Sequence, residues 1–129
     1  MNMILTLPDA GETERQWLSK AGYQCLAYRH PSLGHWCGYV GLPDGNPMHG
    51  KHYDAIDADV HCGLTYADDH APYGKSDGRW WIGFDCAHAV DLVPGISGIW
   101  HRYRDDGTYR DIDFVVAECE RLARQMADA

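Results

Sequence analysis

Two short stretches of the chain bring acid, thiol and imidazole side chains close together in sequence. The residues concerned are Asp59, His61, Cys62, Asp85, Cys86 and His88. Side chains of these types bind metal ions, transfer protons or attack as nucleophiles. The second stretch follows a hydrophobic run typical of a strand, and a rigid scaffold often holds reactive groups at a strand end. Together the two stretches predict a functional site.

A metal centre is the first chemistry that these residues suggest. The candidate ligands are Asp59, His61, Asp85 and His88, because zinc accepts both carboxylate and imidazole ligands. A catalytic zinc ion needs three protein ligands and a water. The chain contains neither an H-E-x-x-H nor a C-x-x-C motif. The alternative is structural, with these side chains hydrogen-bonded to loops and strand ends. The sequence therefore does not determine the cofactor, and zinc is the candidate metal.

Proton transfer and nucleophilic attack are the other two candidate chemistries. His61 could act as acid or base with Asp85 orienting it, and the alternative is a structural His–Asp pair. Cys86 lies two residues before His88, a neighbour that could activate a thiolate. Alternation along the strands places Cys86 on the core face, like Cys62, and a buried thiol is usually inert.

The elements that position these residues are predicted from pattern and composition. Thr13 and Gln16 have capping-box spacing and Gly22 suits a helix end, which predicts a helix at 13–21. Aromatic and aliphatic content predicts strands at 23–29, 35–42, 60–66 and 79–85, separated by a turn at 30–34 and polar loops at 43–51 and 67–78.

The C-terminal part of the chain predicts an amphipathic helix. Its apolar residues recur at helical spacing: Ile112, Val115, Val116, Cys119, Leu122, Ala123 and Met126. The residues at 108–111 can cap its start, and the segment 91–107 is expected to be irregular. We therefore predict one α+β domain over residues 1–129. It has a small antiparallel sheet of about four strands, a short N-terminal helix and a C-terminal helix packed on one face.

Alternation along the predicted strands separates two faces of the sheet. If the more apolar face lies under the C-terminal helix, the other face forms a binding surface for a ligand or partner. Its predicted members are His35, Tyr39, His61, Thr65, Trp81 and Asp85. Gly63 and Gly83 leave room on this face for a ligand or a close backbone. An outward Trp81 would cover a ligand, anchor a partner, or close the far side of the sheet.

Composition excludes some classes of function. The net charge of −8 over 129 residues argues against direct nucleic-acid binding by phosphate neutralisation. No apolar run approaches the roughly 20 residues of a membrane span. The five cysteines are odd in number, and no basic region of a signal peptide precedes them. We therefore expect free thiols and a cytoplasmic location.

Three stretches resemble a group of short bacteriophage, prophage and bacterial proteins that has no assigned activity. They are His30–Gly41 (HPSLGHWCGYVG), Asp59–Tyr66 (DVHCGLTY) and Trp80–His88 (WWIGFDCAH). The pattern of that group has glycine where this chain has Cys62, which weakens a role for that thiol. The resemblance implies a phage accessory or anti-defence factor, and it carries no catalytic residue over to this chain.

Two functions follow as hypotheses. The first is a small soluble accessory protein that binds and inhibits a host protein, or captures a small polar ligand, through the aromatic, histidine and aspartate surface. The alternative is a small hydrolase, with or without a metal ion, that uses His61, Asp85 and His88.

Overall fold

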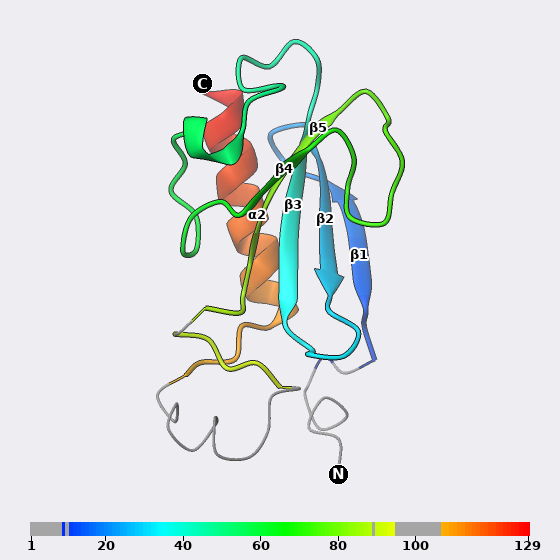
Figure 1. Cartoon of the computed structure of the whole chain (residues 1–129), viewed down its shortest axis with the longest axis vertical. Coiled ribbons are helices and arrows are strands. Elements are labelled where there is room, and N and C mark those ends of the chain that lie inside the picture. The colour runs from blue at the N-terminus through cyan, green and yellow to red at the C-terminus, as the bar shows by residue number, and fades with distance from the viewer. Residues whose placement is uncertain (1–8, 10, 89, 95–106) are drawn as a thin grey trace.

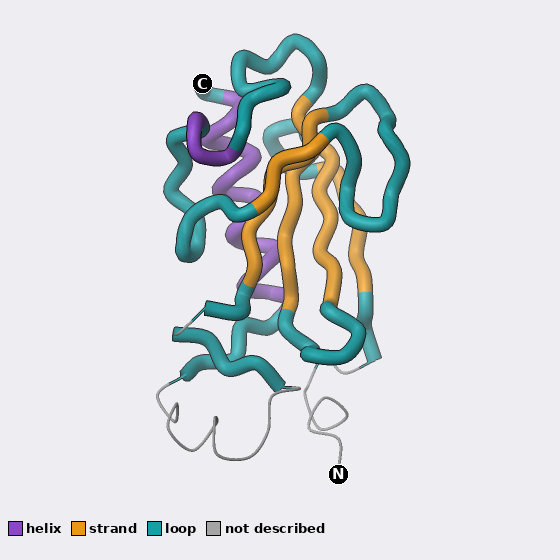
Figure 2. Tube along the Cα trace, viewed as in Figure 1, coloured by secondary structure: helices purple, strands orange, loops and turns teal. Residues whose placement is uncertain are grey.

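One open antiparallel sheet of five strands carries a C-terminal helix on one of its faces (Figure 1). The structure is a computed structural model that describes residue 9 and residues 11–88, 90–94 and 107–129. About half of the described loop residues lie between the third strand along the chain and the last one (Figure 2). This architecture confirms the predicted α+β fold class.

The strands are β1 (Glu14–Leu18), β2 (Gln24–Arg29), β3 (Trp36–Leu42), β4 (Tyr66–Asp68) and β5 (Trp80–Asp85). Their order across the sheet is β1-β2-β3-β5-β4, and every neighbouring pair is antiparallel. The central strand β3 pairs with β2 and β5. The sequence predicts these three strands with nearly correct bounds. The count of about four strands is one too low.

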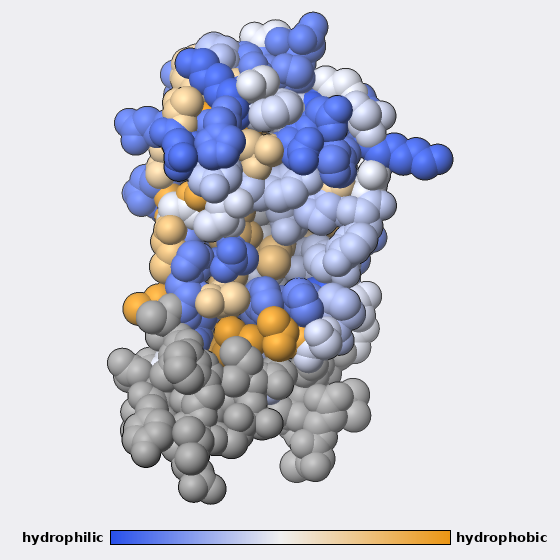
Figure 3. All heavy atoms as spheres, viewed as in Figure 1, coloured by the Kyte–Doolittle hydropathy of each residue, from blue (hydrophilic) through white to orange (hydrophobic). Residues whose placement is uncertain are grey.

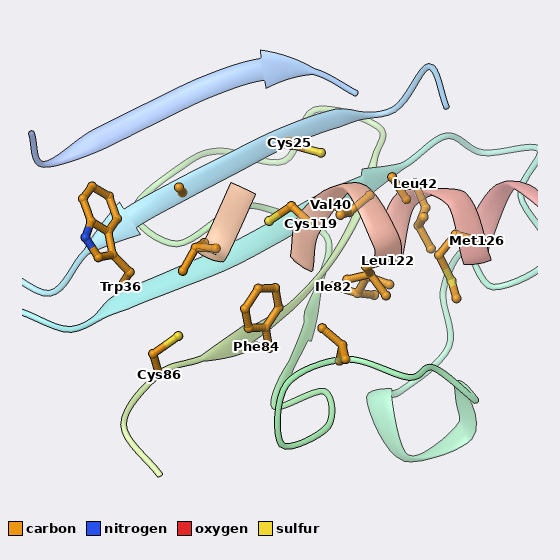
Figure 4. Close-up of a cluster of buried hydrophobic side chains, with 14 of the residues drawn as sticks. Cys25, Trp36, Val40, Leu42, Ile82, Phe84, Cys86, Cys119, Leu122 and Met126 are labelled. Atoms are coloured by element: carbon orange, nitrogen blue, oxygen red, sulfur yellow. The ribbon is translucent and has the colours of Figure 1, made fainter. Parts of the chain in front are cut away.

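Helix α2 (Ile112–Ala127) packs against β3 and β2. The carboxylate of Asp111 caps it by accepting a hydrogen bond of 2.9 Å from the N–H of Phe114. The core lies between this helix and the sheet, as Figure 4 shows for Val40, Leu42, Ile82, Phe84, Cys119, Leu122 and Met126. The predicted C-terminal helix and its apolar face are confirmed. In the part of the chain that the structure describes, no helix combines the length and apolar content that crossing a membrane requires.

The helix predicted at 13–21 is wrong, because this segment forms the edge strand β1. Its residues pair with β2, for example Arg15 with Ala27. The turn that follows is closed by a hydrogen bond of 2.9 Å from the N–H of Gly22 to the carbonyl of Ser19, with Gly22 at φ +93°. A glycine with positive φ suits a helix end and a hairpin equally well. Pairing with β2 decides between the two.

The strand predicted at 60–66 is also wrong over most of its length. Cys62 (φ +54°) and Gly63 (φ +84°) have left-handed backbone conformations, which a strand does not contain. They form a turn in which the N–H of Gly63 donates to the carbonyl of Val60 at 2.9 Å. Only the end of the stretch pairs with β5, because β4 begins at Tyr66.

Two glycines let aromatic rings lie flat across the centre of the sheet. Gly38 lies opposite Phe84 on β5, and Gly83 lies opposite Tyr39 on β3. A Cβ added at Gly38 would lie 2.6 Å from the Phe84 ring and 2.7 Å from Sγ of Cys119. A Cβ at Gly83 would lie 2.3 Å from the Tyr39 ring. The space at Gly83 that the sequence suggested for a ligand is therefore filled by Tyr39.

Asp9 joins the sheet to the start of α2. Its carboxylate accepts hydrogen bonds from Nη2 of Arg29, from Nε1 of Trp36 (3.0 Å), from the hydroxyl of Tyr109 (2.8 Å) and from the N–H of Ile112 (3.0 Å). The Arg29 side chain is 4% exposed and that of Asp9 is 9% exposed. This ion pair is therefore largely removed from water, and one acid holds β2, β3 and the helix N terminus together.

Candidate functional site

Two histidines and two aspartates meet where β5 ends and the chain approaches α2, at the lower end of the sheet in Figure 1. They come from the turn at 60–65, from the last residue of β5 and from the residues that follow it. An arginine from the segment before α2 joins them. We call this set the His–Asp cluster: His61, Asp85, His88, Asp91 and Arg110.

The carboxylate of Asp91 is the centre of the cluster. Nε2 of His61 lies 2.9 Å from its Oδ1 and 3.0 Å from its Oδ2. Nε of Arg110 donates to Oδ1 at 3.1 Å, and the backbone N–H of His88 donates to Oδ2 at 3.0 Å. Burial alone would raise the pKa of Asp91, but the hydrogen bonds from His61, His88 and Arg110 outweigh it, and the pKa is lowered. Asp91 is therefore an ionised carboxylate that orients His61.

His88 and Asp85 form a second pair at the rim of the cluster. Nε2 of His88 lies 3.1 Å from Oδ1 of Asp85, and the two side chains are 30% and 29% exposed. Asp85 also accepts hydrogen bonds of 3.1 Å from the hydroxyl of Thr65 and from the N–H of Ala87. The rings of His61 and His88 are 6.1 Å apart between centroids. The cluster thus combines a buried His–Asp pair with one that reaches solvent.

Helix α2 and the tight turn at 60–63 set the position of His61. The backbone N–H of His61 donates to Oε1 of the buried Glu118 at 2.9 Å. The His61 ring meets the Phe114 ring edge-on, with centroids 5.1 Å apart. The left-handed backbone of Cys62 then turns the chain back, so that its thiol faces the His61 ring. Left-handed conformations of non-glycine residues cluster at functional sites, where their strain is tolerated.

All five cysteines are unpaired, and only Cys62 is exposed. Its Sγ lies 3.7 Å from Nε2 of His61, which corrects the prediction that Cys62 belongs to the core face. Cys86 is buried as predicted, and burial raises its pKa well above the ordinary value. Burial, Asp91 and Asp85 also raise the pKa of Cys62. A thiol with a raised pKa is a poor nucleophile at neutral pH, which disfavours Cys86 as a nucleophile.

The three candidate catalytic residues His61, Asp85 and His88 all lie in the cluster. Their predicted pairing is wrong, because Asp91 and not Asp85 contacts His61. Asp85 instead faces His88, three residues further along the chain.

The fourth predicted metal ligand, Asp59, lies apart from the other three. Its carboxylate pairs with Nη2 of Arg121 at 2.8 Å, and its backbone exchanges hydrogen bonds of 2.7 and 2.8 Å with the Gln125 side chain. Both partners are on α2. Asp59 therefore fastens the loop to the helix, and the single residue between it and His61, Val60, carries the chain into the turn.

The predicted binding face is largely covered. Tyr39 and Trp81 do point away from α2, as alternation predicts, but they are only 7% and 5% exposed. They pack with Leu26 and Cys37 under the partly buried Tyr28, Tyr66 and Ala71. Trp81 therefore closes the far side of the sheet, one of the three uses considered for it. Hydrophilic side chains occupy most of the described surface on the side shown in Figure 3.

His35 and Thr65, the other predicted members of that face, lie in different surroundings. Thr65 is exposed and donates to Asp85. His35 is 7% exposed, and its ring stacks on that of His30 with centroids 5.1 Å apart. Burial and the neighbouring His30 lower the pKa of His35. Its imidazole is therefore neutral at neutral pH, with no hydrogen-bond partner for Nδ1 among the described residues.

Asp91 and Arg110 are the members of the cluster that the sequence did not predict. Asp91 follows His88 at the same three-residue spacing at which His88 follows Asp85, a signal that could have found it. Arg110 carries no such signal. Its guanidinium lies 4.8 Å from the centre of the Phe114 ring, which places it at the start of α2 beside the carboxylate.

A groove of about 510 Å³ lies away from the cluster, between the β1–β2 turn at Lys20 and the C-terminal half of α2. Its lining carries acidic and basic side chains, Glu120 and Arg124 among them, but no imidazole or thiol. The groove therefore lacks the imidazole groups that distinguish the His–Asp cluster.

Fold and cluster together define a small α+β protein with a histidine–carboxylate centre at one end of its sheet. Comparison of the chain with models of protein families, with curated proteins and with solved structures finds no match. The function is therefore argued from the site alone.

Proposed function

We propose that the protein is a small hydrolase that uses the His–Asp cluster for general acid–base catalysis. The convergence of two His–carboxylate pairs from separate chain segments carries this proposal. An ionised carboxylate beside an imidazole orients the ring and stabilises its protonated form, which suits the ring to proton transfer. Buried His–Asp pairs also occur for structural reasons, but here the side chains of the second pair are part-exposed.

The two pairs suit different tasks. His88 is half-buried at the rim and would take a proton from an attacking water, with Asp85 holding its ring. His61 is held firmly by Asp91, Phe114 and Glu118 and would stabilise or protonate the leaving group. The guanidinium of Arg110 adds positive charge where negative charge develops during hydrolysis.

A turnover assay on simple chromogenic substrates tests the proposal. The panel is p-nitrophenyl acetate, p-nitrophenyl phosphate and bis(p-nitrophenyl) phosphate, which represent carboxyl esters, phosphomonoesters and phosphodiesters. We expect the wild type to hydrolyse at least one of them, and His61→Ala to reduce kcat/KM by about 10²–10⁴-fold. His70→Ala is the matched control, because His70 pairs with Asp69 at 2.7 Å on an exposed loop away from the cluster. Equal rates for the wild type and His61→Ala on every substrate would contradict the proposal.

A phage-type accessory protein that binds and inhibits a host protein, such as one of a defence system, is the second candidate, and an exposed aromatic favours it. Tyr73 is 86% exposed, has a left-handed backbone at φ +62° and lies 5.5 Å from Tyr28 between ring centroids. Exposed, positioned tyrosines are common anchors in protein interfaces. We further propose a reducing, cytoplasmic location, which the five unpaired thiols support.

The two candidates respond differently to one substitution. If the protein is an inhibitor, Tyr73→Ala should weaken its complex with a captured host protein by about tenfold or more, as measured by calorimetry. The same change should leave hydrolysis unaltered. An unaltered affinity would argue against Tyr73 as the anchor of an inhibitory surface.

A further inference from the structure

Three different donor atoms face one another at the His–Asp cluster. They are Nε2 of His61, Sγ of Cys62 and a carboxylate oxygen of Asp91, and all lie within 4.8 Å of one another. Nε2 of His61 is 2.9 Å from Asp91 and 3.7 Å from Cys62. We infer that His61, Cys62 and Asp91 bind one zinc ion or a similar transition-metal ion.

The geometry argues for a metal ion and against a Cys–His–Asp relay. In a relay, the carboxylate holds one ring nitrogen while the nucleophile contacts the other. Here Asp91 and Cys62 both face the same nitrogen, Nε2 of His61. Metal coordination requires donor atoms that converge on one point, as these nitrogen, sulfur and oxygen atoms do.

The donor set and its spacing select the kind of metal. Calcium and magnesium take oxygen ligands, whereas zinc accepts thiolate, imidazole and carboxylate together. Bonds of about 2.0–2.3 Å to a tetrahedral zinc ion place its ligand atoms roughly 3–4 Å apart. The separation between Nε2 of His61 and Sγ of Cys62 lies in this range. The hydrogen-bonded separation from Asp91 needs to widen by a few tenths of an ångström.

The surroundings would hold the three ligands in place. Arg110 and the N–H of His88 hydrogen-bond the Asp91 carboxylate, and the Phe114 ring fixes the plane of His61. Such outer contacts are typical of metal ligands. Cys62 is exposed, so the side of the cluster that it borders can leave a fourth position to water.

This inference rests on the proposed function and deepens it. When a metal is bound, Nε2 of His61 would be a ligand, and the ion, in place of that ring, would stabilise the leaving group. Zinc lowers the pKa of a bound water towards neutrality and so makes a hydroxide nucleophile available. The part-exposed pair of His88 and Asp85 lies beside the three ligands, where it could exchange protons with such a water. Metal binding can be measured without any substrate.

Metal titration of the full chain, purified without a histidine tag and stripped with a chelator, tests the inference. Zn²⁺ is titrated against a chromophoric chelator, and Co²⁺ is added separately to record its absorption spectrum. We expect one equivalent of metal per chain and a thiolate-to-cobalt band. Cys62→Ser should abolish that band and weaken Zn²⁺ binding by about tenfold or more, and His61→Ala should weaken it similarly. Because Cys62 is exposed, its replacement should leave the fold intact.

His70→Ala is the control, because Asp68, Asp69 and His70 form the second set of potential ligands among the described residues. Absence of stoichiometric binding, equal affinity in Cys62→Ser and the wild type, or loss of binding only in His70→Ala would each overturn the inference. Hydrolysis by protein that binds no stoichiometric metal would overturn the metal site and leave the proposed function standing. Zinc binding at the three residues without hydrolysis of the panel would do the reverse.

Discussion

Replacement of Asp9 by alanine is expected to lower the free energy of unfolding by about 3–5 kcal/mol, because it leaves the buried guanidinium of Arg29 without its counter-ion. The change also removes the acceptor of hydrogen bonds from Trp36, Tyr109 and the first turn of α2. For a chain of this size, the melting midpoint should fall by about 10–20 °C. Thermal and urea-induced unfolding, followed by circular dichroism, would measure the melting midpoint and the free energy of unfolding.

The stabilisation by Asp9 should also depend on pH. Burial alone would raise the pKa of Asp9, but hydrogen bonds from Tyr109 and Arg29 outweigh it, and the folded-state pKa lies below the ordinary value of 3.8. A lowered folded-state pKa contributes stability that is fully present above the unfolded-state pKa and is lost as the pH falls through the folded-state pKa. The wild type should therefore lose stability below about pH 4. The Asp9→Asn variant should not show the part of this loss that protonation of Asp9 causes.

Two further variants separate a buried ion pair from a general effect of charge. Glu12→Ala breaks the Arg15–Glu12 pair, whose atoms are 2.8 Å apart but whose side chains are 39% and 33% exposed, and should cost at most about 1 kcal/mol. The double change Asp9→Ala with Arg29→Met removes both buried charges and should recover part of the loss. A similar midpoint for Glu12→Ala and Asp9→Ala would show that Asp9 is not the junction described.

Alanine substitutions at Asp85 and Asp91 should both strongly reduce hydrolysis but differ in their effect on stability. We expect kcat/KM to fall by about 10²–10⁴-fold in each, because each carboxylate orients one histidine. Asp85 is part-exposed, so its loss should change the unfolding free energy by about 1 kcal/mol or less. Asp91 is buried and holds His61 and the N–H of His88, so its loss should cost about 2–4 kcal/mol.

The measurement pairs a melt with a turnover assay, on the chromogenic substrate that the wild type hydrolyses fastest. Asp68→Ala is the matched control, because Asp68 lies 3.4 Å from an exposed histidine, His70, and is itself about half exposed. This variant should match the wild type in both assays. Asp85→Ala with full activity and lower stability would mean that the pair with His88 is structural.

The parts of the fold that could be predicted are those in which local pattern and tertiary contacts agree. Helix α2 has an apolar face with helical period, and strands β2, β3 and β5 have dense aromatic and aliphatic content. Both patterns are independent of the rest of the chain. The edge strand β1 has a polar, alternating pattern and helix-like ends, and only its partner β2 reveals it as a strand.

The sequence predicts which residues belong to the candidate site better than it predicts their contacts. His61, Asp85 and His88 were selected by residue type near strand ends, and the structure brings them together. The partner of His61 depends on a turn in which Cys62 has a left-handed backbone conformation. Residue type seldom predicts this conformation except at glycine and asparagine. Asp91 and Arg110 lie on loop segments, and no pattern in the sequence indicates their contacts.

The two pairs of glycine and aromatic residues at the centre of the sheet fix the alignment of β3 with β5, and this alignment positions part of the site. Sliding β5 by one residue past β3 would set Tyr39 against a bulky neighbour in place of Gly83, so only one alignment of the two strands is tolerated. In that alignment Asp85 lies opposite Cys37 at the strand end. A slip of one step would displace Asp85 by about 3.4 Å and turn its carboxylate to the opposite face. The two glycines thus set the position of Asp85 relative to β3, and with it the place of the Asp85–His88 pair.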